Sequence, residues 1–238
     1  MRNALIVGGS NGIGLAVARN LKEYDNIYIV DKQAPEENLG TQFHFIEFNL
    51  LDDDYSIFDS LEDINTLIIT AGFGRLALFS DLKDEDIIAS FQVNTIGVIR
   101  IIKHFYSKIS GTDDFYCAIM GSISGMLSSP FFSIYGATKA ALCKFIESVN
   151  VELIKGGTNN QILNISPGSI KGTKFYDGEN NLDLTSPLAC EILKKMYKKE
   201  DLFIPDYETI YKSVLERYNK DFRKFGLESY DYKLKSNR

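Results

Sequence analysis

Three observations predict that this chain forms one α/β domain, a doubly wound parallel sheet of about seven strands with helices on both faces. Apolar runs of four to seven residues alternate with longer stretches of helical period, which is typical of repeated βαβ units. A glycine cluster follows the first run, where such folds turn from strand into helix. The 238 residues, 45% of them hydrophobic, suffice to bury one core.

The apolar runs predict the strands. The predicted ranges are 4–7, 27–30, 43–48, 66–70, 115–120 and 162–166, with a short seventh run at 202–204 that Pro205 closes. Helices are expected between them. The clearest runs from Ile134 to Lys155, where apolar residues recur three and four positions apart until Gly156 and Gly157 end it.

The pattern changes beyond residue 170. Residues 171–183 are polar, contain glycine and lack periodicity, which predicts a mobile loop. Ser186 and Pro187 are expected to start a helix of about a dozen residues, so 171–199 forms a substrate loop and helix. Helical spacing from Asp206 to Gly226 predicts a final helix with an aromatic face, and the C-terminal helix and tail occupy 206–238 of the single domain 1–238.

Composition argues against several classes of function. The net charge of -6 and pI near 5.1 disfavour a nucleic-acid surface. The apolar run that opens at Ala4 is too short for a secretion signal or a membrane span, which predicts a cytoplasmic protein with no membrane partner. The three cysteines and two histidines are scattered, so no disulfide framework and no metal site are expected.

The glycine cluster directly follows the first predicted strand and opens a helix. Glycines let a diphosphate approach the backbone, and free N–H groups at the helix start favour its negative charge. This context indicates a dinucleotide site. The candidate cofactor residues in the turn are Gly8, Ser10, Asn11, Gly12, Ile13 and Gly14.

Asp31 ends the second predicted strand, seventeen residues beyond Gly14. A carboxylate there can accept hydrogen bonds from the adenosine ribose hydroxyls, which favours NAD over NADP. The neighbouring Lys32 could instead neutralise a 2′-phosphate, so NADP stays open.

Tyr135 and Lys139 lie four residues apart near the start of the clearest helix, so both side chains project from one face. A nearby ammonium stabilises a phenolate and would lower the pKa of the tyrosine. Tyr28 and Lys32 share this spacing, but on a strand, where such residues are about 13 Å apart. Ser122 follows the fifth predicted strand and can reach the same substrate oxygen.

Together these residues resemble the classical subgroup of the short-chain dehydrogenase/reductase family, from Leu5 to about Ile170. The resemblance implies a Rossmann-type fold. The cofactor glycines of that family correspond to Gly8, Gly12 and Gly14, its fourth-strand motif to residues 69–72, and its catalytic tetrad to Asn94, Ser122, Tyr135 and Lys139.

The resemblance also implies cofactor contacts outside the glycine turn, where backbone groups of Ile170 would bind the nicotinamide carboxamide. Val7 and Thr70 occupy positions where the family usually has a threonine and an asparagine. Thr173 is one residue later than the usual threonine after the Pro-Gly element. The implied contacts are Asn49, Leu50, Ala71, Gly72, Tyr135, Lys139, Pro167, Gly168, Ile170 and Thr173.

The implied reaction interconverts a secondary alcohol and a ketone or aldehyde by hydride transfer at nicotinamide C4, with Tyr135 as general acid and base. Ser122 would hydrogen-bond the substrate oxygen, Lys139 would bind the nicotinamide ribose and lower the pKa of Tyr135, and Asn94 would hold a proton-relay water. The resemblance further implies a homodimer or homotetramer formed partly through the helix that carries Tyr135.

Two alternatives stay open at this point. One is a nucleotide-sugar epimerase or dehydratase of the extended subgroup, which the glycine spacing and the lack of a long C-terminal domain disfavour. The other is a non-catalytic NAD(P)-binding redox sensor, which the complete tetrad disfavours. The small-molecule substrate would contact residues after Gly74 and the segments 126–132 and 171–183, where Phe131, Phe132, Phe175 and Tyr176 suggest a partly aromatic pocket.

Overall fold

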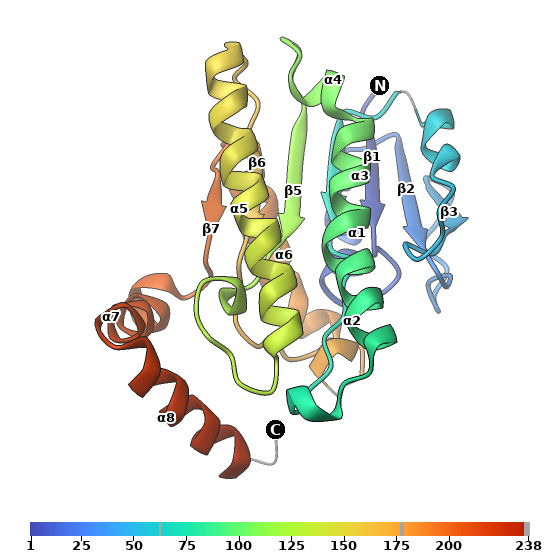
Figure 1. The fold of residues 1–238 in the computed structure, drawn as a ribbon. Coiled ribbons are helices and arrows are strands. Elements are labelled where there is room, and N and C mark those ends of the chain that lie inside the picture. The colour runs from blue at the N-terminus through green and yellow to red at the C-terminus, as the bar shows by residue number, and fades with distance from the viewer. Residues whose placement is uncertain (62, 177–178, 236–238) are drawn as a thin grey trace.

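In the computed structural model, which describes residues 1–61, 63–176 and 179–235, seven strands form one parallel sheet, as the sequence predicts. The strand order is β3-β2-β1-β4-β5-β6-β7, so the chain changes direction across the sheet between β1 and β4 (Figure 1). The strands are β1 (Asn3–Val7), β2 (Asn26–Asp31), β3 (Phe43–Glu47), β4 (Thr66–Ile69), β5 (Tyr116–Met120), β6 (Ile162–Ile165) and β7 (Leu202–Phe203).

Helices cover both faces of the sheet. Alternate residues of β1 point to opposite sides: Leu5 and Val7 belong to one buried cluster, and Ala4 and Ile6 to the other. The first cluster is covered by α3 (Gly97–His104) and α5 (Ser133–Gly156), and the second by α1 (Gly12–Asn20) and α6 (Leu182–Tyr197). The Rossmann-type, doubly wound fold class is therefore confirmed.

The remaining helical segments lie in the connections between these elements or follow the last strand. They are the α-helices α2 (Asp84–Phe91), α4 (Tyr106–Ile109), α7 (Lys212–Lys220) and α8 (Phe222–Lys235), 3-10 turns at Ser56–Ser60, Phe79–Asp81, Ile123–Gly125 and Lys174–Tyr176, and π-helical turns at Gln92–Ile96 and Tyr207–Tyr211. Among the described residues, no helix combines the length and the apolar character that crossing a bilayer requires.

The helix before β7 begins earlier than predicted. Ser186 and Pro187 do not start it, because α6 begins at Leu182. The side-chain oxygen of Asn181 accepts hydrogen bonds from the backbone N–H groups of Asp183 and Leu184 at 3.1 and 3.3 Å and caps the helix there. Pro187 then lies inside the helix, where it lacks one hydrogen-bond donor.

The predicted final helix from Asp206 to Gly226 is also wrong. Asp221 has an extended backbone and separates α7 from α8, and its side chain accepts the N–H of Lys224 at 2.9 Å, which starts a new helix. Gly226 lies inside α8, where its backbone runs close to Ser128. Of the predicted loop 171–183 and tail 206–238, residues 177–178 and 236–238 lie outside the described residues.

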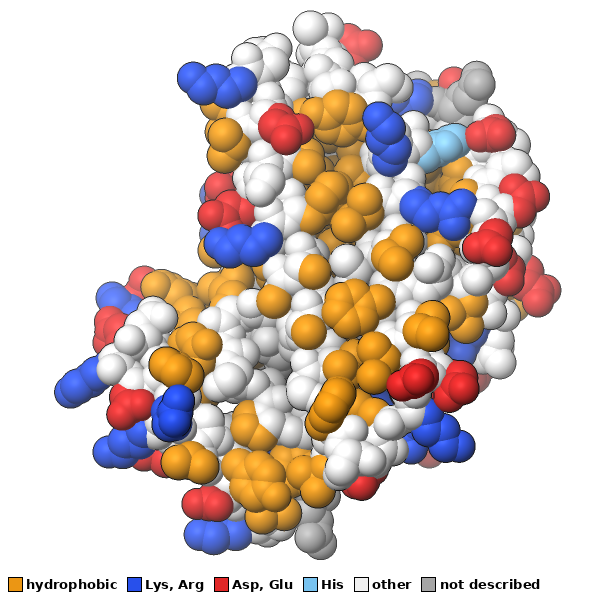
Figure 2. All heavy atoms as spheres, viewed as in Figure 1, with side chains coloured by type: hydrophobic (Ala, Val, Ile, Leu, Met, Phe, Trp, Pro, Cys, Tyr) orange, Lys and Arg blue, Asp and Glu red, His pale blue; other side chains and the backbone are white. Residues whose placement is uncertain are grey.

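One face of the molecule exposes apolar side chains. Figure 2 shows them between α5 and α3, on the side of the sheet that α5 covers. Val151 and Ile154 of α5 are 57% and 61% exposed, and Ile96 is 45% exposed.

Candidate active site

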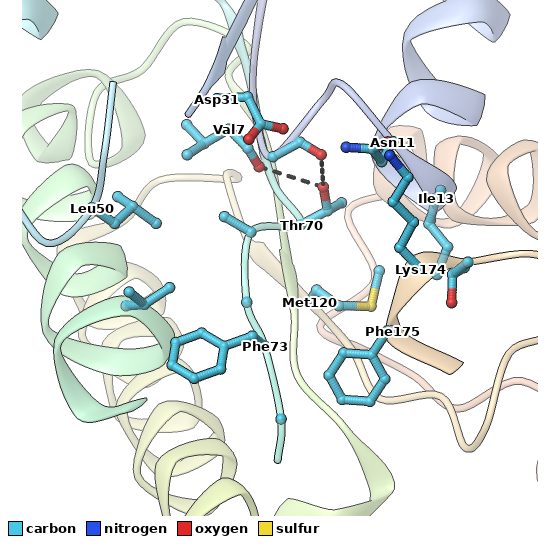
Figure 3. Close-up of a pocket in the computed structure, with 18 of the residues that line it drawn as sticks. Val7, Asn11, Ile13, Asp31, Leu50, Thr70, Phe73, Met120, Lys174 and Phe175 are labelled. Carbon is cyan, nitrogen blue, oxygen red and sulfur yellow. Dashed lines mark hydrogen bonds between the residues drawn. The ribbon is translucent and has the colours of Figure 1, made fainter. Parts of the chain in front are cut away.

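A cavity of about 650 Å³ lies at the carboxyl ends of the strands. The loops that follow β1, β2, β4, β5 and β6 all contribute to its wall (Figure 3). Such a crevice, beside the point where the strand order reverses, is the usual ligand site of an open parallel sheet.

The glycine turn forms one part of this wall. Gly8 has a φ of +86°, and a Cβ atom there would overlap the backbone of Ala71. A Cβ atom on Gly14 would likewise overlap the carbonyl oxygen of Gly8. The Thr70 hydroxyl donates to this same oxygen at 3.0 Å, so the threonine that departs from the family pattern still braces the turn (Figure 3).

The N-terminus of α1 faces the segment that follows β6. The backbone N–H of Gly12 donates to the side-chain oxygen of Asn180 at 2.6 Å. Thr173 also lies against this turn, since its methyl carbon would be 3.2 Å from a Cβ atom on Gly12. Thr173 thus lines the cavity at the glycine turn despite its late position in the sequence.

Asp31 projects from the end of β2 into the adjoining part of the cavity (Figure 3). Its carboxylate accepts the backbone N–H of Ser10 at 3.1 Å and that of Lys32 at 2.8 Å. The negative charge is therefore held in place by two backbone donors. Ser10 itself is buried and reaches Asp31 through its backbone, while its side chain is not part of the cavity wall.

The part of the cavity beside the carboxyl end of β5 is lined by Ser122, Tyr135 and Lys139. Ser122 hydrogen-bonds the Tyr135 side chain, and its oxygen also accepts the N–H of Ser124 at 3.1 Å. The Lys139 ammonium, 2% exposed, donates to the carbonyl oxygen of Met120 at 2.7 Å. Tertiary structure thus joins a strand end to a helix start, as the sequence predicts.

Burial dominates the pKa values of this cluster. Burial raises the pKa of Tyr135 to about 12, and the hydrogen bond from Ser122 opposes only part of this rise. The Lys139 ammonium donates to the Met120 carbonyl and lies 5.8 Å from the Tyr135 ring centroid, so a buried positive charge lies near the phenol. Burial in turn lowers the pKa of Lys139 to about 8. The phenol is therefore protonated at neutral pH.

Asn94 lies behind the cavity wall rather than on it. It occupies the π-helical turn Gln92–Ile96 and is fully buried. Its side chain donates to the carbonyl of Phe73 at 2.8 Å and accepts the N–H of Phe73 at 2.9 Å. Asn94 thus fixes the backbone just after Gly72, and the predicted water-holding role stays a prediction.

The remaining predicted cofactor residues line the cavity. Asn49 uses its side-chain oxygen to accept the N–H of Leu51 at 3.1 Å, and the carbonyl of Ile170 accepts the Thr173 hydroxyl at 3.2 Å. The predicted residues on the wall are Gly8, Asn11, Gly12, Ile13, Gly14, Asp31, Lys32, Asn49, Leu50, Ala71, Gly72, Tyr135, Lys139, Pro167, Gly168, Ile170 and Thr173.

Aromatic rings enclose the Tyr135 side chain. The centroids of the Phe132 and Phe175 rings lie 5.6 and 5.2 Å from that of Tyr135, and Phe73 lines the wall across from Phe175 (Figure 3). Of the aromatic residues suggested by the sequence, Phe175 lines the cavity, while Phe132 packs on Tyr135 and Phe131 on Tyr230 without lining it. The side chain of Tyr176 lies outside the described residues.

Sequence reasoning did not single out Lys174 or Asn180. Both belong to an aperiodic segment, and no motif marks them. Only the fold brings Lys174 to the cavity wall and Asn180 to the glycine turn, where it contacts a residue 168 positions away.

Comparison with known proteins is consistent with this geometry. The family model described as short chain dehydrogenase matches residues 2–181. An uncharacterized oxidoreductase of Saccharomyces cerevisiae is 25% identical over 216 residues, which cover 81% of this chain and 70% of the relative. Carbonyl reductase family member 4 of Xenopus laevis is 28% identical over 202 residues, covering 80% of each chain.

A solved structure shares the fold. A short chain dehydrogenase from Burkholderia cenocepacia, in complex with NADP, superposes with a TM-score of 0.74 at 18% identity, covering 91% of this chain and 98% of that one. Every predicted site residue, from Gly8 to Thr173, lies within the range that the family model matches.

Proposed function

The chain is an oxidoreductase that belongs to the short-chain dehydrogenase family, and on this premise we propose that it interconverts a secondary alcohol and a ketone or aldehyde by hydride transfer. The observation that carries the proposal is one continuous cavity with Asp31 and the glycine turn in one part and Ser122, Tyr135 and Lys139 in another. This arrangement fits a dinucleotide beside a carbonyl-polarising site.

The residues present fit a dinucleotide. The Gly12 N–H at the start of α1 donates to the neutral amide oxygen of Asn180 at 2.6 Å, and a diphosphate oxygen would replace that acceptor. The turn itself depends on glycine, because a Cβ atom at Gly8 would overlap the Ala71 backbone and one at Gly14 would overlap the Gly8 carbonyl. When bound, a nicotinamide ring supplies or accepts the hydride.

We infer that NAD is the preferred cofactor. The Asp31 carboxylate, fixed by two backbone N–H groups, suits ribose hydroxyls and would repel a 2′-phosphate. The Burkholderia enzyme of similar fold binds NADP, and Lys32 supplies a cation at the same edge, so NADP is the competing assignment.

Tyr135 is proposed to transfer the proton. The buried phenol is protonated at neutral pH, so its hydroxyl can donate a hydrogen bond and then a proton to a carbonyl oxygen. Ser122 would hydrogen-bond the substrate oxygen as negative charge develops there. Lys139 supplies a buried positive charge beside Met120 that stabilises the phenolate left after proton transfer.

The walls support a substrate with an apolar group next to its carbonyl. Phe132 and Phe175 contact the Tyr135 ring, so a carbonyl that reaches the hydroxyl must lie against aromatic surface. The charged side chains on the described wall are Asp31 and Lys32 beside β2, Lys174 in the segment after β6, and Lys139. Neutral aryl or alkyl ketones are therefore the first candidates.

We further propose a homo-oligomer that forms through α5. The exposed Val151 and Ile154 lie on the helix that carries Tyr135, and an apolar patch of this kind on a helix face favours association with a second copy.

The test measures oxidation of NADH and NADPH by purified protein with a panel of neutral aromatic and aliphatic ketones and aldehydes. Wild-type protein is expected to turn over at least one of them. Tyr135→Phe is expected to lose about a hundredfold or more in kcat while it still binds NADH. Equal turnover by wild type and Tyr135→Phe would rule out the mechanism, and cofactor binding with no turnover across the panel would favour a redox sensor.

A further inference from the structure

We propose that Lys174 is a ligand of the cofactor diphosphate. When the cofactor binds, the Lys174 ammonium leaves the Glu36 carboxylate and pairs with the diphosphate instead. The proposal rests on the proposed function, since it requires a dinucleotide in the cavity. Its starting point is geometric: Lys174 lines the cavity, and its side chain extends toward Asn11 in the glycine turn (Figure 3).

The segment that carries Lys174 lies against the start of α1. Thr173, the preceding residue, contacts Gly12, and Asn180 accepts the Gly12 N–H at 2.6 Å. The N–H of Gly12 therefore already bonds an oxygen at the position where a helix start binds phosphate. An ammonium that reaches the same turn from Lys174 would add a positive charge beside that oxygen site.

The present partner of Lys174 is easily replaced. Its ammonium lies 2.9 Å from a carboxylate oxygen of Glu36, but the two side chains are 51% and 82% exposed. Such an exposed ion pair contributes little to stability. A diphosphate carries two negative charges and would lie in the cavity, where hydrogen bonds to charged groups are stronger. Glu36 would be left in water, so the exchange buries no unpaired charge.

The other cations on the described wall serve different places. Lys32 follows Asp31 at the end of β2, and Lys139 donates to Met120 beside Tyr135. Lys171 is exposed and is not part of that wall. Lys174 is thus the lining cation whose neighbour, Thr173, lies against the glycine turn, and Lys171 is a matched control in the same segment.

The experiment compares ligand binding by wild type, Lys174→Met and Lys171→Met, using NADH fluorescence and calorimetry with ADP-ribose and adenosine. Lys174→Met is expected to weaken NADH and ADP-ribose binding about tenfold, since it removes one hydrogen bond between charged groups. Adenosine lacks phosphate, so its binding is expected to be unchanged, and Lys171→Met is expected to bind all ligands as wild type does. Lys174→Arg should retain most of the affinity.

Glu36→Gln tests the exchange itself. Releasing Lys174 from its present partner is expected to tighten NADH binding about twofold to threefold, and this gain should vanish when Lys174→Met is also present. Wild-type affinity in Lys174→Met, an equal loss in Lys171→Met, or a gain from Glu36→Gln that persists without Lys174 would overturn the inference alone. Failure of the wild type to bind NADH, NADPH and ADP-ribose would overturn the proposed function together with it.

Discussion

Lys233 near the end of α8 donates to the carbonyl oxygen of Pro130 at 2.7 Å, which ties the C-terminal helix to the loop that precedes α5. The same ammonium donates to Ser129 at 2.8 Å and lies 5.2 Å from the ring centroid of Phe132. Tyr230 stacks on Phe131, which has a left-handed φ of +66°. Because Phe132 contacts Tyr135, α8 supports a ring that packs directly against the candidate proton-transfer residue.

Lys233→Met tests this contact through pH. Burial lowers the pKa of Lys233 to about 8 from 10.5, so between these values the unfolded chain binds more protons than the folded one. The free energy of unfolding of wild type relative to Lys233→Met is therefore expected to increase as pH rises from about 8 to 10.5. Urea unfolding of both proteins across this range measures it, and a constant difference would refute the assignment.

Asp31→Asn tests the choice of cofactor. The amide removes the charge, while its oxygen can still accept the N–H of Ser10. The ratio of kcat/KM for NADH to that for NADPH is expected to fall about tenfold to a hundredfold. The substitution removes a negative charge that would repel the 2′-phosphate of NADPH at close range. Lys32→Ala is the opposite control and is expected to lower kcat/KM for NADPH. An unchanged ratio in Asp31→Asn would assign cofactor choice to other residues.

Gly14→Ala tests the close approach inside the glycine turn. The added methyl group would overlap the Gly8 carbonyl and the Thr70 hydroxyl, so we expect a loss of about 2–3 kcal/mol of stability and weaker NADH binding. Gly156→Ala, in the last turn of α5, meets no atom within 4 Å and is expected to stabilise by about 0.5 kcal/mol. Thermal unfolding and NADH titration compare the two variants; equal effects would contradict the model of the turn.

Charged residues placed on the exposed face of α5 are expected to disrupt the proposed contact between copies. Replacing both Val151 and Ile154 by Glu is expected to convert the wild-type oligomer into a smaller species, because two carboxylates would be buried at the contact. Sedimentation velocity measures the change. Phe45→Glu, on the edge strand β3, supplies a control with an exposed apolar residue far from α5 in the sheet order. A monomeric wild type would refute this interface.

Local sequence patterns predict most of the strand and helix boundaries. Each predicted strand agrees with an observed strand to within one residue at either end, and α5 extends one residue beyond its predicted range at each end. Apolar spacing is periodic in both kinds of element, and Gly157 ends α5 with a left-handed φ of +83°. The two wrong helix boundaries arise where a cap, from Asn181 or Asp221, outweighs Pro187 and Gly226 as a local signal.

The sequence by itself determined the sheet, the glycine turn, Asp31 and the spacing of Tyr135 and Lys139, because these depend on residues adjacent along one strand or helix. Only the tertiary structure decided that Asn180 reaches the glycine turn and Lys174 the cavity wall, that α8 holds the loop before α5, and that burial raises the pKa of Tyr135. Contacts between distant segments and the loss of water around a buried group arise from packing of the whole domain, and no local pattern encodes them.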